Sequence, residues 1–214
     1  GKGSGKIFKA VKGVSFEVPK GQILGICGRN GSGKSTLLRA ISGIFSADSG
    51  SINLHGNSIS LLSIGVGFQK KLTGYENIFL SGLLLGYTKE QVEEKINDII
   101  EFSELGDFIY KPVSSYSSGM YSKLAFSITA ILETDIMLID EVLSVGDIHF
   151  REKSYNKMKE LINDSDRTVV IVSHSTKTIV ELCDKVIWLH DGLIKDEGEP
   201  AEIMAKYEEY MRSS

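Results

Sequence analysis

A glycine-rich loop between an apolar strand and an apolar helix constrains this 214-residue chain more than any other feature. Residues 28–35 read Gly-Arg-Asn-Gly-Ser-Gly-Lys-Ser, which fits the pattern G-x-x-x-x-G-K-S/T at every fixed position. The run Ile23–Cys27 predicts a short buried strand before the loop, and helical spacing follows it at Leu37, Leu38, Ile41 and Ile44. The alternative is a glycine turn before a purely structural helix. Strand, glycine loop and helix together favour a phosphate-binding loop in an α/β fold.

Each residue type in this loop has a physical reason to be there. Glycines let backbone N–H groups turn toward a phosphate where a Cβ would clash, and the following helix directs its partial positive end at the same point. Lys34 brings positive charge to the β- and γ-phosphates as a catalytic contribution, and the Ser35 hydroxyl can ligate Mg²⁺. We expect nucleotide contacts from Gly28, Arg29, Asn30, Gly31, Ser32, Gly33, Lys34, Ser35 and Thr36.

A second apolar run ends in two carboxylates. Ile136–Ile139 predicts a buried strand, and Asp140 and Glu141 follow at its carboxyl end, where open α/β sheets bind ligands. Asp140 would hold Mg²⁺ through water, which leaves Glu141 to polarise the attacking water as a general base. The alternative is a strand end capped by a solvated acidic pair.

Two further polar residues are candidates of different weight. His174 follows the apolar strand Thr168–Val172, and its place after the strand that succeeds the acidic pair favours a contact with the γ-phosphate. A lone histidine there is otherwise structural. Gln69 could reach Mg²⁺ or the attacking water, although glutamines on loops are common.

The segment Tyr116-Ser117-Ser118-Gly119-Met120 lies at the start of a predicted helix. Serines and a glycine at a helix N-terminus form an anion site of hydroxyl and N–H groups. Since one phosphate loop is already present, a second anion site makes sense if two copies dock head to tail and complete each other's site. Ordinary capping by Ser117 or Ser118 is the alternative.

Composition limits the classes of partner. The chain has 24 Lys and Arg against 28 Asp and Glu, a net charge of −4, so nucleic acid is not expected. Its two cysteines, Cys27 and Cys183, form no disulfide framework, so a reducing cytosol is expected. Since no apolar run approaches the ~20 residues of a membrane-spanning helix, any spanning must be done by another chain.

The remaining pattern predicts an α/β core with an all-helical insertion. Residues 72–113 have helical spacing, with a capping box at Thr88–Gln91, and Asp191-Gly192 predicts a hairpin turn. We expect a single domain in which 1–71 and 114–214 form the core and a β subdomain, and 72–113 form a helical subdomain. Other expected elements are strands at 14–18 and 168–172, short strand-like pieces at 50–67, a helix from Ser118 to Leu132, hairpin strands at 186–190 and 193–195, and a closing helix at 200–210.

Taken together, these motifs resemble the nucleotide-binding subunit of ATP-binding-cassette (ABC) transporters over essentially the whole chain. The phosphate loop, Gln69, Tyr116–Met120, Asp140-Glu141, Ser144–Asp147 and His174 occur in the family's order and approximate spacing. The resemblance implies a P-loop core of ABC-ATPase type with an antiparallel β subdomain and a helical subdomain.

The resemblance also implies roles and partners. Ser117 and Gly119 would contact the γ-phosphate bound by the opposite subunit, with Ser118 also among the nucleotide-binding residues. Asp147, a further nucleotide-binding residue, would lie in a loop that communicates between the two sites. Ser35, Gln69 and Asp140 would hold Mg²⁺ with ATP. The implied assembly is a head-to-tail dimer on the cytoplasmic face of the membrane, docked through the helical subdomain to a separate multi-span permease.

Departures from the common pattern favour one branch of the family. Tyr-Ser-Ser-Gly-Met stands where Leu-Ser-Gly-Gly-Gln is common, and Ser-Val-Gly-Asp where Ser-Ala-Leu-Asp is common. Both variants are similar to exporters of polysaccharides, O-antigen and teichoic acids, and residues 72–78 and 186–190 resemble teichoic-acid exporters. The family's adenine-stacking aromatic has one candidate here, Phe8, which is equally a core residue of the first strand.

Two other functions stay open at this point. One is a non-transport ABC ATPase acting on DNA, ribosomes or other soluble machinery; the other is a regulatory sensor that binds ATP without turnover. Because the chain stops soon after its last predicted helix, we expect no carbohydrate-binding extension and expect the partner to select the substrate.

Overall fold

The computed structural model describes residues 21–28, 67–134, 136–140, 147–164, 167–191 and 193–214, with backbone alone at 140. It also gives the backbone of 6–9, 15–18 and 59–61. The chain divides into two compact units. Unit 1 comprises Gly1–Ile44, Leu138–Glu141 and Ile162–Ser214, and unit 2 comprises Phe45–Met137 and Val142–Leu161.

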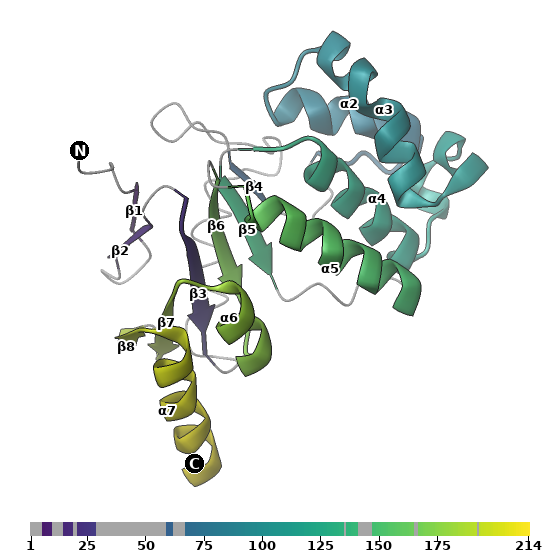
Figure 1. The fold of residues 1–214 in the computed structure, drawn as a ribbon. Coiled ribbons are helices and arrows are strands. Elements are labelled where there is room, and N and C mark those ends of the chain that lie inside the picture. The colour runs from purple at the N-terminus through teal and green to yellow at the C-terminus, as the bar shows by residue number, and fades with distance from the viewer. Residues whose placement is uncertain are drawn as a thin grey trace. The chain divides into compact units, whose positions relative to one another are not determined.

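Within the described residues, the main sheet has six strands in the order β4-β5-β6-β3-β7-β8. At its centre, β3 pairs in parallel with both β6 and β7, while β7 and β8 form an antiparallel hairpin (Figure 1). Parallel strands are buried on both faces, which explains why their sequences are continuous apolar runs. The strand bounds are β3 Ile23–Cys27, β4 Ile59–Leu61, β5 Ile136–Asp140, β6 Thr168–Val172, β7 Lys185–His190 and β8 Leu193–Gly198.

Before the main sheet, β1 (Lys6–Lys9) and β2 (Ser15–Val18) form an antiparallel pair in which Phe8 lies opposite Phe16. The alternation at 14–18 therefore predicted a strand correctly, and the hairpin of β7 and β8 is confirmed as well. Asp191, in the turn of that hairpin, has a φ of 50°, which is the left-handed region that such turns require.

In unit 1, α6 (Thr176–Leu182) and α7 (Pro200–Ser213) follow the strands of the sheet. Gly25 of β3 lies so close to α6 that a Cβ there would come within 2.8 Å of both Cys183 Sγ and Ile179 Cδ1. This close approach is why the middle of the strand is glycine. The apolar cluster of the unit joins these elements through Cys27, Ile179, Val186, Trp188, Ile203, Met204 and Tyr207.

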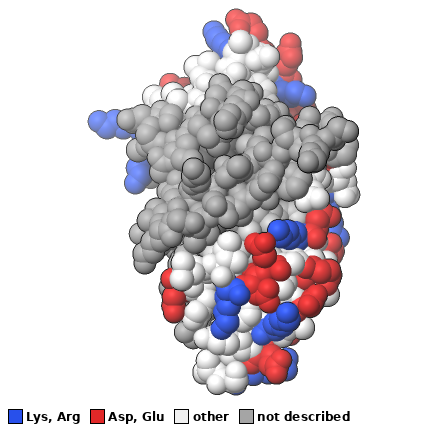
Figure 2. Space-filling view, turned by 90° about the vertical axis from the view of Figure 1, so that its left-hand side faces the viewer, with Lys and Arg blue, Asp and Glu red and all other residues white. Residues whose placement is uncertain are grey.

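Charged side chains of both signs lie close together on part of the described surface. On the face shown in Figure 2, Lys and Arg lie beside Asp and Glu in the lower part of the view, next to areas of uncharged residues. In unit 1, Lys206 pairs with Asp196 at 3.3 Å and with Glu202 at 3.5 Å, and Lys185 pairs with Glu197 at 3.5 Å. Because such exposed ion pairs contribute little stability, each unit depends mainly on its own apolar cluster.

In unit 2, side chains cap the N-termini of α2 (Gly74–Leu84), α3 (Lys89–Ser103) and α4 (Ser118–Ile131). The Thr88–Gln91 capping box is confirmed, with Thr88 Oγ1 accepting from the Gln91 N–H at 3.2 Å and Gln91 Oε1 accepting from the Thr88 N–H at 2.9 Å. An equivalent box joins Thr73 and Glu76 at the start of α2. Two 3₁₀ helices, η2 (Gly106–Tyr110) and η3 (Val113–Ser115), lie between α3 and α4.

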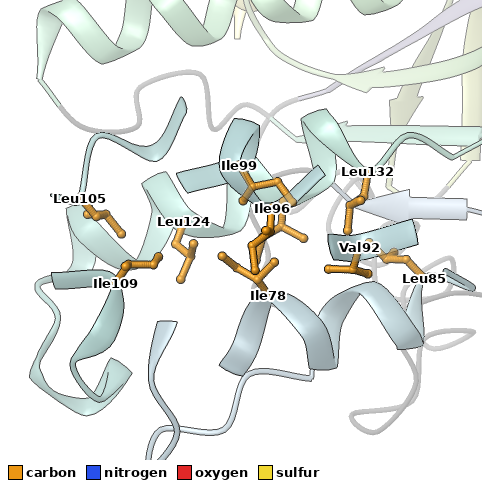
Figure 3. Close-up of a cluster of buried hydrophobic side chains, with 10 residues drawn as sticks. Ile78, Leu85, Val92, Ile96, Ile99, Leu105, Ile109, Leu124 and Leu132 are labelled. Carbon is orange, nitrogen blue, oxygen red and sulfur yellow. The ribbon is translucent and has the colours of Figure 1, made fainter. Parts of the chain in front are cut away.

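One apolar core joins these helices (Figure 3). It includes residues of α4 as well as of α2 and α3, so the compact unit extends beyond the 72–113 segment singled out in the sequence. Its buried members are Ile78, Leu85, Val92, Ile96, Ile99, Leu105, Ile109, Leu124, Ile128 and Leu132.

The last helix of unit 2, α5 (Ile148–Ile162), packs through an aromatic cluster. Phe102 of α3 stacks on Phe126 of α4 with centroids 6.0 Å apart, and Phe150 of α5 meets both rings edge-on. The Lys153 ammonium lies 4.3 Å from the Phe102 ring centroid, a cation–π distance. The start of α5 is therefore fixed to α3 and α4.

Candidate nucleotide-binding site

The structure describes only part of the predicted site. Gly28, Gln69, Ser117, Ser118, Gly119, Asp147 and His174 are among the described residues, and Asp140 is described by its backbone alone. Arg29, Asn30, Gly31, Ser32, Gly33, Lys34, Ser35, Thr36 and Glu141 lie outside the described residues. Their roles stay predictions.

Within unit 1, the parallel register brings two predicted site residues to one edge of the sheet. Ile26 of β3 lies opposite Val172 of β6, and the Ser173 N–H donates to the Ile26 carbonyl at 3.0 Å. Gly28, buried just after β3, and His174, exposed just after β6, therefore leave the sheet at the same carboxyl edge. Asp140 is the last residue of β5, which is next to β6 in the sheet. This is the edge at which α/β sheets bind ligands.

His174 lines an open hollow. The rest of the lining comes from α6 and α7: Thr176, Tyr207, Glu208, Met211 and Arg212. The Thr176 hydroxyl donates to Glu208 at 2.7 Å, and Arg212 pairs with Glu208 at 3.7 Å. The exposed histidine at a strand end is thus accessible, as a residue that contacts a ligand must be.

In unit 2, the backbone of Gln69 is held by a residue that the sequence did not single out. The Gln69 N–H donates to Asn77 Oδ1 at 2.8 Å, and Asn77 Nδ2 donates to the Gln69 carbonyl at 3.0 Å. Asn77 is fully buried, while Gln69 is exposed. The exposed amide oxygen of Gln69 is a ligand type that Mg²⁺ accepts, so this residue fits the predicted metal set.

At the start of α4, Ser117 is the helix cap. Its hydroxyl accepts from the Met120 N–H at 3.1 Å, so the capping that was the alternative to an anion site is present and is made by Ser117. The N–H groups of Ser118 and Gly119 precede the helix's own hydrogen-bond ladder and so point out of its N-terminus. Among the described residues, a Cβ at Gly119 would come within 4 Å of one atom, the Ser117 hydroxyl oxygen at 3.9 Å. The described packing around α4 therefore leaves space for a Cβ there.

The two unusual residues of the Tyr116–Met120 segment both have packing roles. Tyr116 and Met120 pack against the helical core of unit 2, and the Tyr116 hydroxyl donates to the Phe108 carbonyl of η2 at 2.6 Å. A Cβ at Gly74 would overlap that hydroxyl, so the tyrosine and the glycine at the start of α2 fit each other.

Asp147 caps α5. The Phe150 N–H donates to Asp147 Oδ1 at 2.9 Å, and this hydrogen bond, with the nearby Lys123 charge, holds the pKa of Asp147 below its ordinary value. Asp147 is therefore an anion at the N-terminus of a helix, where the helix dipole favours negative charge.

The first turns of α5 are also held by a charged cluster. Glu104, at the end of α3, accepts from His149 at 3.0 Å and from Lys153 at 3.4 Å. Burial alone would raise the pKa of Glu104, but these hydrogen bonds and the Lys153 charge bring it below its ordinary value. The helix that follows Asp147, α5, is thus held to the end of α3 by charge as well as by aromatic packing.

Solved structures share this fold. A structure described as the ATP-binding subunit of an ABC transporter matches with a TM-score of 0.75 and 21% identity, over 93% of this chain and 87% of that one. A dimeric post-hydrolysis structure of the ATP-binding cassette MJ0796, bound to ADP and Pi, matches with a TM-score of 0.68 and 21% identity, over 93% and 97%. The predicted class is therefore confirmed: the chain has the α/β fold of P-loop nucleotide-binding cassettes.

Sequence comparisons define the family. Residues 11–144 match the ABC transporter family model. The O-antigen export system ATP-binding protein RfbB of Myxococcus xanthus is 43% identical over 203 residues, 95% of this chain and 46% of the relative. The teichoic acids export ATP-binding protein TagH of Lactococcus lactis is 46% identical over 207 residues, 97% of this chain and 44% of the relative. The chain belongs to the ABC transporter family, and it spans less than half the length of these two relatives.

Among the helices in the described part of the chain, none is both long and apolar enough to span a membrane.

The contacts of Glu104 should make the free energy of unfolding depend on pH. An unfolded chain has the carboxyl at its ordinary pKa of 4.5, and the folded chain has it lower, so the folded state binds fewer protons. The carboxylate therefore stabilises the fold above the ordinary pKa, and this contribution is lost as the pH falls through the folded-state pKa. Urea unfolding of Glu104→Gln should show a deficit at neutral pH that disappears in acid.

The matched control is Glu101→Gln, an exposed glutamate in the last turn of the same helix. It should unfold like the parent protein at both pH values. A Glu104→Gln deficit that persists unchanged in acid would contradict the assigned role of the carboxylate.

Proposed function

We propose that this chain is the ATP-hydrolysing unit of an ABC exporter that moves a lipid-linked teichoic acid or a related cell-surface polysaccharide outward. The observation that carries the proposal is 43–46% identity over 95–97% of the chain to ATP-binding proteins of O-antigen and teichoic-acid export. The chain would work at the cytoplasmic face of the membrane, through a separate multi-span permease that docks on the helices of unit 2.

The proposed catalytic unit is a head-to-tail dimer with two shared sites. Lys34 and the N–H groups after β3 would hold the phosphates of one ATP, and Ser117 and Gly119 of the other copy would close on its γ-phosphate. The exposed N-terminus of α4, with space above Gly119, supports this arrangement. A closed dimer excludes water and fixes the phosphates, and positioning with charge stabilisation supplies most of the catalysis in phosphoryl transfer.

Hydrolysis would then depend on two side chains at the sheet edge. Glu141 would take a proton from the attacking water, while His174 would donate a hydrogen bond to the γ-phosphate. Ser35, Gln69 and Asp140 would hold Mg²⁺, which when bound neutralises charge on the β- and γ-phosphate oxygens. Asp147, fixed at the start of α5, would lie between the two sites and link them.

Replacing the proposed base tests the hydrolytic step. Glu141→Gln keeps the size of the side chain but removes its basicity, so turnover should fall about 100-fold or more while ATP binding persists. Size-exclusion chromatography with Mg·ATP should show a trapped dimer. In a cell that depends on this protein, the variant should leave lipid-linked glycan accumulated on the inner side of the membrane.

Two results would contradict this proposal in different ways. Unchanged turnover in Glu141→Gln would remove that residue from the base role. Normal glycan export in a cell lacking the protein would instead remove the proposed cargo and favour a non-transport ABC ATPase.

A glycine substitution separates the folding of α4 from its proposed role in the shared site. Gly119→Ala should leave the free energy of unfolding unchanged or raise it by up to about 1 kcal/mol, because alanine is the better helix former and the site is open. The same methyl should weaken the ATP-dependent dimer about tenfold or more, since an added methyl in a closely packed interface costs ~1–3 kcal/mol.

Analytical ultracentrifugation with Mg·ATP and the Glu141→Gln background would measure this dimer. Asn97→Ala, an exposed change in α3 that also improves helix propensity, is the control and should not alter dimerisation. Equal dimerisation of Gly119→Ala and its parent would argue against close contact at this position.

A further inference from the structure

Asn77 is a fully buried amide in the second turn of α2. Its four polar contacts are all to backbone groups: Oδ1 accepts from the Gln69 N–H at 2.8 Å, and the two N–H groups of Nδ2 are shared among the carbonyls of Gln69, Thr73 and Leu72 at 3.0, 3.0 and 3.3 Å. Both polar atoms of the side chain are therefore engaged.

An asparagine is an unfavourable choice here unless these bonds matter. Asparagine is a poorer helix former than alanine or leucine, and burying an amide is costly unless it is hydrogen-bonded. These bonds stabilise the backbone of Gln69, whose N–H and carbonyl both pair with Asn77. Backbone N–H and carbonyl groups outside helices and strands need such partners, and for Gln69 one side chain supplies both.

A second set of bonds joins the same segment to the residues that lead into α4. The Ser114 N–H donates to the Lys70 carbonyl, and the Val113 N–H donates to the Leu72 carbonyl, both at 2.9 Å. On the other side of Gln69, the Phe68 ring meets Tyr121 of α4 edge-on, with centroids 5.0 Å apart. Residues 68–72 and the start of α4 are thus parts of one hydrogen-bonded and packed body.

We propose that Asn77 is a positioning residue for Gln69: it fixes the Gln69 backbone, from which the side chain is presented to Mg²⁺, and makes this backbone move with the start of α4. This inference rests on the proposed function, in which Gln69 serves the nucleotide of its own chain and Ser117 that of the opposite chain. Residues 68–72 and the start of α4 would then move together, with Gln69 serving one shared site and Ser117 the other. Asn77 itself touches no nucleotide.

Two substitutions test this role in the full chain. Asn77→Ala removes all four bonds, and Asn77→Asp keeps an acceptor for the Gln69 N–H but loses the donors to the three carbonyls. The first readout is amide hydrogen exchange at Gln69, which should become faster in Asn77→Ala and change less in Asn77→Asp. If Asn77→Ala fails to fold, Asn77→Asp is used in its place. We expect it to bind the metal more weakly, because it has lost the donors that hold the Gln69 carbonyl.

The second readout is the affinity for Mn²⁺ in the presence of a non-hydrolysable ATP analogue, measured by electron paramagnetic resonance. Loss of a residue that orients a metal ligand typically weakens metal binding about 10-fold or more, and we expect that loss in Asn77→Ala. In a Gln69→Ala background the same substitution should cause no further loss, because Asn77 acts through Gln69.

Thr88→Ala is the matched control, since it removes the cap of α3 in the same unit without touching Gln69 and costs about 1 kcal/mol. It should leave Mn²⁺ affinity and Gln69 exchange unchanged. Parental Mn²⁺ affinity in Asn77→Ala, or an equal loss in Thr88→Ala, would overturn the positioning role. If Gln69→Ala alone has parental Mn²⁺ affinity, the metal role of Gln69 fails, and exchange at Gln69 still decides whether Asn77 holds it.

Discussion

The buried amide of Asn77 is the interaction on which the described geometry around Gln69 depends. Residues 69–73 lead into α2, and their backbone groups pair with two other parts of unit 2. Asn77 supplies the pairing from inside α2, and segment 111–114 supplies the rest. The exposed Gln69 side chain is thereby presented from a fixed backbone, and the same bonds continue toward the cap of α4.

A different constraint shapes unit 1. The strand β3 lies between two parallel partners, so it must be apolar along its whole length, and its contact with α6 requires glycine at position 25. The register with β6 brings Gly28 and His174 out at one edge. The predicted phosphate loop would therefore follow a strand that is buried at four of its five positions.

The sequence was informative where structure is local. Apolar runs predicted β3, β5 and β6, and the Thr88–Gln91 box and the α4 cap follow from side chains three residues apart. It was silent where partners are distant or irregular. Asn77 reaches eight residues back to Gln69, and Glu104 meets His149 across 45 residues. Hydrophobic periodicity does not predict such pairs, because the tertiary fold alone brings them together.

The Tyr116 position illustrates the same limit. In the sequence it was a departure from the family pattern that favoured one branch of exporters, with no physical role attached. In the structure its hydroxyl bonds to Phe108 and fits against Gly74, so the departure has a packing partner elsewhere in the chain.

The central claim is that each nucleotide site is shared between two copies of this chain. Mixing two inactive variants tests it most directly: Lys34→Ala, with a damaged phosphate loop, and Ser117→Arg, with a blocked start of α4. A heterodimer of the two contains one site in which both halves are intact. The account predicts that ATP hydrolysis, absent from each variant alone, returns when they are mixed. A mixture that stays inactive although the two variants form heterodimers would contradict it.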